Sequence, residues 1–96
     1  MRVRISAAAR DDIARVLAYL MERNPAVASQ LSGRFREHIG RLGTFPELGR
    51  PVDRLGTGLR LLIVEAHLIF YRVRPDEVTV IRVVDGRMNI NPELFG

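Results

Sequence analysis

Three strand-like runs joined by very short connections occupy the second half of the chain. They cover residues 59–64, 67–74 and 77–84, and β-branched side chains dominate the last of them. The connections at 65–66 and 75–76 are short enough to permit only antiparallel hairpins. The sequence therefore predicts a three-stranded antiparallel meander.

Two amphipathic helices are predicted before this meander. Ser6 is a suitable N-cap for the first helix, and Asn24-Pro25 ends it and starts the second, because Asn caps helices and Pro is tolerated in a first turn. Mostly apolar residues recur at helical spacing, which predicts one buried face on each helix. These residues are Ile13, Val16, Leu17, Leu20 and Met21 in the first helix, and Val27, Leu31, Phe35, His38, Ile39 and Leu42 in the second. The short break predicts a hairpin of antiparallel helices.

The expected architecture is a single α+β domain over residues 1–96, with the element order β-α-α-β-β-β. Residues 2–5 alternate polar and apolar side chains, which predicts a short strand that extends the sheet. Two prolines and two glycines within residues 43–51 predict a loop. The helical hairpin packs on one face of a small antiparallel sheet, and the other face is either exposed to solvent or covered by another segment.

Composition excludes several classes of site. The chain has no cysteine, and its two histidines are far apart in sequence, so we expect neither a metal site nor a cofactor. Hydrophobic residues make up 47%, a globular composition. No signal pattern and no membrane-spanning apolar run is present, which predicts a cytoplasmic protein with no membrane contact.

Charge indicates the kind of partner. The net charge is +4, and every basic residue is arginine, a side chain that makes bidentate contacts with carboxylate or phosphate. Strand alternation allows Arg60, Arg72 and Arg82 to share one surface of the sheet. Such a surface suits an acidic protein segment or nucleic acid, and the charge alone does not choose between them.

Several short motifs, in order, carry a resemblance to a known family. They are SAAARDDI at 6–13, FPELGRP at 45–51, GLR at 58–60, LIFYRV at 68–73, VIRVV at 80–84 and GRMN at 86–89. Together they cover nearly the whole chain and resemble the ParE branch of the RelE/ParE superfamily of bacterial toxins.

The resemblance implies a toxin of a type II toxin–antitoxin system that binds and inhibits DNA gyrase without enzymatic activity. It also implies a cognate antitoxin with a DNA-binding N-terminal part and a C-terminal segment that folds onto the toxin, so operator DNA is contacted only through the antitoxin. The candidate antitoxin-binding residues are Arg60, Arg72 and Arg82, and the candidate target-binding residues are Arg87, Met88 and Asn89.

Two alternatives stay open: a ribosome-dependent messenger RNA endoribonuclease of RelE type, and a non-toxic corepressor partner of the antitoxin. The ribonuclease needs basic groups and a terminal His or Tyr around the scissile phosphate. Arg60 matches one cation position, but Leu62 and Leu68 are apolar where such enzymes carry further cations. Asp85 stands where many relatives, ParE proteins included, have His, and no tyrosine follows it. We therefore assign no catalytic residue.

Other polar or aromatic residues have structural interpretations. His67 is expected to be a solvated turn residue, Tyr71 a core or sheet-face residue, and Asp85 a turn residue. Asp11 and Asp12 are expected to stabilise the helix dipole. The tail from residue 85 onward is expected to add little to the core, although its Leu-Phe pair could anchor it onto the helical hairpin.

Overall fold

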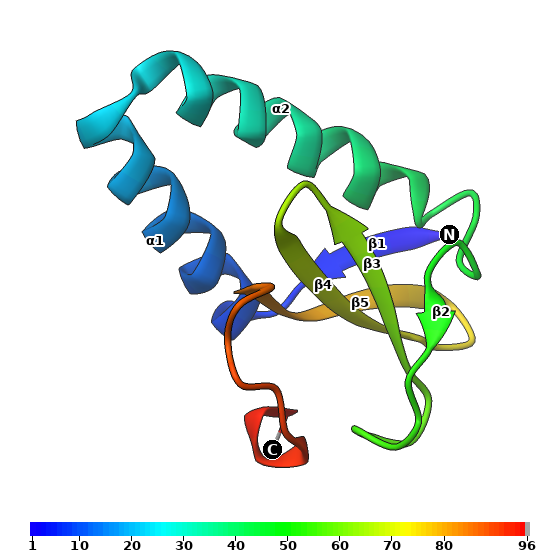
Figure 1. The fold of residues 1–96 in the computed structure, drawn as a ribbon. Helices are drawn as coiled ribbons and strands as arrows, with labels where there is room; N and C mark the ends of the chain where they lie inside the picture. The colour runs from blue at the N-terminus through cyan, green and yellow to red at the C-terminus, as the bar shows by residue number, and fades with distance from the viewer. Residues whose placement is uncertain (96) are drawn as a thin grey trace.

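The computed structural model describes residues 1–95 and has two layers, a helical hairpin and a sheet (Figure 1). The elements are β1 (Arg2–Ile5), α1 (Ala7–Arg23), α2 (Pro25–Arg41), β2 (Arg50–Pro51), β3 (Leu59–Val64), β4 (His67–Val73), β5 (Glu77–Asp85) and the 3-10 helix η1 (Pro92–Phe95). The strands form one five-stranded sheet in the order β1-β5-β4-β3-β2. The α+β class and the antiparallel β3-β4-β5 meander are confirmed. Within residues 1–95, no helix combines the length and apolarity needed to cross a membrane.

The predicted caps are both present, and the first one also ties α1 to the sheet. The Ser6 hydroxyl oxygen accepts a hydrogen bond from the Ala9 N–H (3.1 Å) and donates one to the Ile81 carbonyl (2.9 Å). The Asn24 side chain accepts from the Val27 N–H (3.3 Å). These bonds satisfy helix N–H groups that have no partner within the helix.

The tip of the hairpin extends beyond the sheet (Figure 1). Met21 and Val27, which the helical spacing places on buried faces, are 58% and 40% exposed there. Helical periodicity predicts which face turns inward, but not how far the opposing layer reaches.

The N-terminal strand corrects one expectation, because β1 runs parallel to β5 and the sheet is not wholly antiparallel. The helical hairpin separates β1 from the meander, so no short turn fixes its direction. Arg2 and Arg4 donate hydrogen bonds of 2.8 and 2.9 Å to the Glu77 carboxylate. The bond from Arg2, followed by those from Arg4 and Thr79, lowers the pKa of Glu77 to about 2.

The segment predicted as a loop, residues 43–51, contains the short strand β2, which pairs with β3. Tyr71 is fully buried, as expected, and holds this segment in place. Its hydroxyl donates to the Pro46 carbonyl (2.8 Å) and accepts from the Gly49 N–H (2.7 Å). A Cβ at Gly49 would lie 2.6 Å from a β3 carbonyl oxygen, so the close approach requires glycine.

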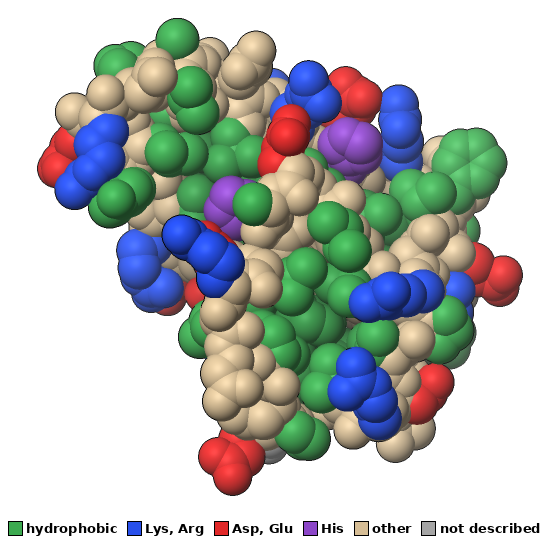
Figure 2. All heavy atoms as spheres, viewed as in Figure 1, with side chains coloured by type: hydrophobic (Ala, Val, Ile, Leu, Met, Phe, Trp, Pro, Cys, Tyr) green, Lys and Arg blue, Asp and Glu red, His purple; other side chains and the backbone are tan. Residues whose placement is uncertain are grey.

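The core has two parts, one on each face of the sheet. The buried residues between the hairpin and the sheet are Ala9, Leu31, Phe35, Ile39, Leu42, Val64, Ile69, Tyr71, Val78, Val80 and Val83. Those on the opposite face are Val52, Leu55, Leu59, Leu61, Phe70 and Val84. We call the second set the outer core; in Figure 2 apolar side chains gather on this face.

The C-terminal tail covers the outer core, which corrects the expectation that it adds little to the core. Ile90, Leu94 and Phe95 pack against the outer core, and the rings of Phe95 and Phe70 are 4.6 Å apart. The tail is thus anchored on the sheet and not on the helical hairpin.

Candidate functional site

The three arginines predicted to share a surface do not. Arg60 lies opposite Tyr71, which belongs to the hairpin-side core, whereas Arg72 lies opposite Leu59, which belongs to the outer core. Since paired residues point to the same face of a sheet, Arg60 and Arg72 point to opposite faces. Arg72 donates from Nε to the Thr57 carbonyl (3.2 Å) in the loop before β3.

Arg82 has an internal partner. Its Nε and Nη2 donate to the two carboxylate oxygens of Asp12 at 2.7 and 2.9 Å. Asp12 is only 5% exposed and also accepts from the Val83 N–H (2.9 Å). The bond to Asp12 raises the pKa of Arg82. Asp12 therefore joins α1 to β5, and stabilising the helix dipole is not its main role.

A β-bulge in β5 explains why the alternation of side chains along the strand does not predict the position of Arg82. Tyr71 lies opposite Val80 and Phe70 lies opposite Arg82, so Ile81 is an extra residue in β5. The extra residue shifts the alternation, so that Arg82, opposite Phe70, points to the outer-core face, where its Nη1 also donates to the Leu94 carbonyl (3.4 Å).

Arg60 borders a shallow groove that we call the edge groove. The groove has a volume of about 670 Å³ and is lined by Met1, Thr44, Phe45, Pro46, Glu47, Leu48, Gly58, Arg60 and Val73. Arg60 donates from Nε to the Gly49 carbonyl (2.8 Å) and from Nη2 to the Glu47 carbonyl (3.2 Å). Phe45 is 59% exposed and Leu48 is 47% exposed. The groove thus combines a held guanidinium with exposed apolar side chains. The FPELGRP motif supplies much of this lining, yet the single-residue predictions did not include it.

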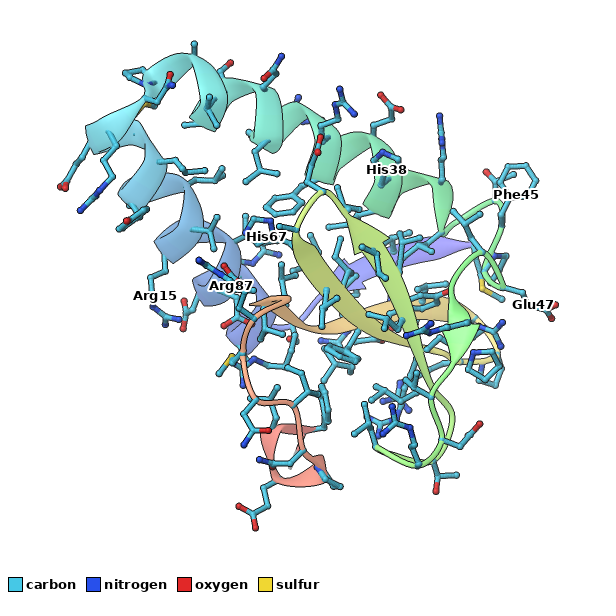
Figure 3. The ribbon with its side chains drawn as sticks, viewed as in Figure 1. Arg15, His38, Phe45, Glu47, His67 and Arg87 are labelled. Carbon is cyan, nitrogen blue, oxygen red and sulfur yellow. The ribbon has the colours of Figure 1, made fainter. Side chains whose placement is uncertain are left out.

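A second hollow, which we call the hairpin pocket, lies between α1 and the adjacent ends of β4 and β5. It has a volume of about 520 Å³ and is lined by Arg15, Val16, Tyr19, Leu20, His67, Asp85 and Arg87. Figure 3 shows Arg15, His67 and Arg87 grouped on this side, and Phe45 and Glu47 at the far end of the molecule.

His67 is not the solvated turn residue that was expected. It is half-buried, and its ring meets the Phe35 ring edge-on at 5.5 Å. Its Nδ1 is buried and has no hydrogen-bond partner among the described residues.

Asp85 holds Arg87 beside the pocket. The Arg87 guanidinium donates to both carboxylate oxygens at 3.1 Å, and the Arg87 backbone N–H donates at 2.8 Å. The side-chain bond and then the backbone bond lower the pKa of Asp85 to about 2. Met88 and Asn89 follow on an exposed segment, so residues 87–89 are accessible, and their role in target binding stays a prediction.

The two hollows differ in chemistry. The edge groove is lined by two charged side chains, Arg60 and Glu47, and by no histidine or tyrosine. The hairpin pocket has a histidine, a tyrosine and two arginines, but its carboxylate is already engaged by Arg87. In residues 1–95, no group of three or more His, Cys, Asp or Glu side chains is arranged to hold a metal ion.

Comparison with known proteins places this fold and these motifs in a family. The sequence model of the ParE toxin of the type II toxin–antitoxin system parDE matches residues 3–90. Toxin ParE3 of Caulobacter vibrioides is 37% identical over 84 residues, which span 86% of this chain and 84% of that protein.

Solved structures with a similar fold include the chromosomal ParDE toxin–antitoxin system of P. aeruginosa, at a TM-score of 0.76 and 18% identity. They also include the RelBE2 toxin–antitoxin complex of Mycobacterium tuberculosis, at a TM-score of 0.62 and 21% identity. Both matches cover 88% of this chain and 95% of the matched chain. The fold is therefore shared across both branches of the superfamily. The sequence matches are to ParE toxins, and they show that the chain belongs to the ParE family of type II toxin–antitoxin toxins.

Proposed function

We propose that this ParE toxin inhibits DNA gyrase by binding it, without enzymatic activity, and that a cognate antitoxin neutralises it in the cytoplasm. The match to the ParE family over residues 3–90 carries the proposal. The edge groove supports it, because Arg60 is the one cationic side chain among its lining residues and no histidine or tyrosine lines it. A ribonuclease site of RelE type needs several basic groups and a terminal His or Tyr around the scissile phosphate.

We further propose that the antitoxin docks through an acidic, apolar-containing C-terminal segment on the edge groove. Phe45 and Leu48 supply exposed apolar surface, and Arg60 supplies a positive charge held by backbone carbonyls. Coupled folding of a disordered segment buries such surface and pairs its carboxylates with the arginine. Arg72 is a second contact on the other face of the sheet, whereas Arg82 is engaged by Asp12. The antitoxin's N-terminal part contacts operator DNA, and the toxin does so only through it.

Induced expression of the toxin is expected to block replication and to trigger a DNA-damage response before translation falls. Purified toxin should trap gyrase on cleaved DNA in a supercoiling assay. Transcript mapping during induction should show no new codon-phased cuts. Ribosome-dependent RNA cleavage by the purified protein would overturn the proposal, and antitoxin binding without growth inhibition would favour a non-toxic corepressor.

Phe45→Asp is expected to weaken antitoxin binding at least tenfold in calorimetry, because it removes an apolar contact and places a negative charge beside the docked acidic segment. Phe45 is 59% exposed, so the variant should fold normally. Arg60→Gln should act in the same direction. The matched control is Arg74→Gln, which removes an exposed charge that does not line the groove. Unchanged affinity in both groove variants would place the antitoxin elsewhere.

A further inference from the structure

The hairpin pocket has features of a binding site for an anion. Two guanidinium groups reach it from different segments, Arg15 from α1 and Arg87 from the chain after β5. Their side chains are 73% and 92% exposed. Tyr19 from α1 and His67 from β4 also line the pocket, and their side chains carry a hydroxyl and an imidazole that can form hydrogen bonds.

Both guanidinium groups can turn to an external anion at little cost. Arg15 lies 3.6 Å from an Asp12 oxygen. When Arg15 moves away, Asp12 still accepts hydrogen bonds from Arg82 and from the Val83 N–H. The Asp85 side chain is 39% exposed, so water can solvate it when the Arg87 guanidinium swings away. Neither movement leaves a buried, unpaired carboxylate, which is the costly outcome.

We propose that the hairpin pocket binds a phosphoryl group, with Arg15 and Arg87 as its charged contacts and the Tyr19 hydroxyl as a neutral donor. A planar carboxylate matches the fork of one arginine, whereas a tetrahedral phosphate presents oxygens to donors arriving from several sides. The pocket volume of about 520 Å³ exceeds that of a bare phosphate, and its apolar walls, Val16 and Leu20, suit an attached sugar or ring.

A phosphoryl group of this kind occurs on a free nucleotide and along a DNA strand. The test titrates the purified toxin, without gyrase or antitoxin, with inorganic phosphate, thymidine 5′-monophosphate and a short single-stranded oligodeoxynucleotide. Amide and ring NMR signals of Tyr19 and His67 report binding, and sodium chloride keeps the ionic strength constant because salt screens charge. Saturable shifts in these signals are expected. Tighter binding of the oligonucleotide than of the mononucleotide identifies DNA as the source, and the reverse identifies a small ligand.

The double variant Arg15→Gln/Arg87→Gln should bind at least tenfold more weakly, since each arginine contributes a charge-assisted hydrogen bond. Asp85→Asn should bind severalfold more tightly, because it loosens Arg87 and removes a negative charge from the pocket. Arg74→Gln, an exposed arginine outside the pocket, should bind like wild type. The proposal fails if Arg74→Gln weakens binding as much as the double variant, if acetate binds as tightly as phosphate, or if no shift saturates. The three arginines are exposed and Asp85 is half-buried, and the spectra themselves report whether each variant is folded.

Discussion

Replacing Asp12 by alanine is expected to lower the free energy of unfolding by about 3 kcal/mol, a large part of the roughly 5–15 kcal/mol typical of a small domain. The substitution removes the acceptor for Arg82 Nε and Nη2 and for the Val83 N–H. A guanidinium and a backbone N–H would be left poorly solvated beneath α1. We place the loss at the low end of the range for broken buried pairs because the Arg82 side chain is 22% exposed and water reaches it.

Urea unfolding at constant protein concentration measures this loss. Asp11→Ala is the matched control, since Asp11 is exposed on the same helix and should change stability by less than about 0.5 kcal/mol. The double variant Asp12→Ala/Arg82→Leu should lose less than the sum of the single losses, because it leaves no uncompensated charge. A loss for Asp12→Ala as small as the control would show that the pair is not structural.

Deleting residues 90–96 is expected to lower the free energy of unfolding by about 2–4 kcal/mol. Full burial of one apolar side chain contributes roughly 1.5–3 kcal/mol, and each of the three half-buried apolar side chains lost here contributes part of that. These side chains, Ile90, Leu94 and Phe95, cover the outer core, which the truncation would expose to water. Gly96, also removed, lies outside the described residues. Thermal melts give the stability, and Glu93→Ala, at an exposed tail position, is the control.

Toxicity of the truncated protein, scaled to its folded fraction, separates two roles of the tail. The truncation keeps residues 87–89, so a scaled toxicity equal to wild type means that the last residues act only through stability. A wild-type melting temperature would contradict the assignment of the tail to the outer core.

Much of the fold could be predicted because local chemistry determines it. Ser6 and Asn24 cap helices through bonds to nearby residues, and the short β3-β4 and β4-β5 connections leave only antiparallel pairing. The direction of β1 and the existence of β2 depend on partners distant in sequence, which local patterns do not encode.

The candidate site was harder to predict for the same reason. Alternation alone does not reveal that Ile81 is an extra residue, so it cannot place Arg82 against Asp12. The half-burial of His67 against Phe35 requires knowing where α2 crosses the sheet. Residues 87–89 are exposed because residues beyond the last strand have no ladder partner, and their role in target binding stays a prediction.

The pairing of β1 with β5 also determines when the molecule can finish folding. Arg2 meets Glu77 across 75 positions of sequence, so the first strand has no partner until β5 has been synthesised. Ribosomes make the N-terminal part first, and contacts between distant segments form late because closing a long loop costs entropy. During translation the sheet therefore stays incomplete, with β1 unpaired, until β5 has been made. The toxin cannot complete its five-stranded sheet until the last strand has left the ribosome.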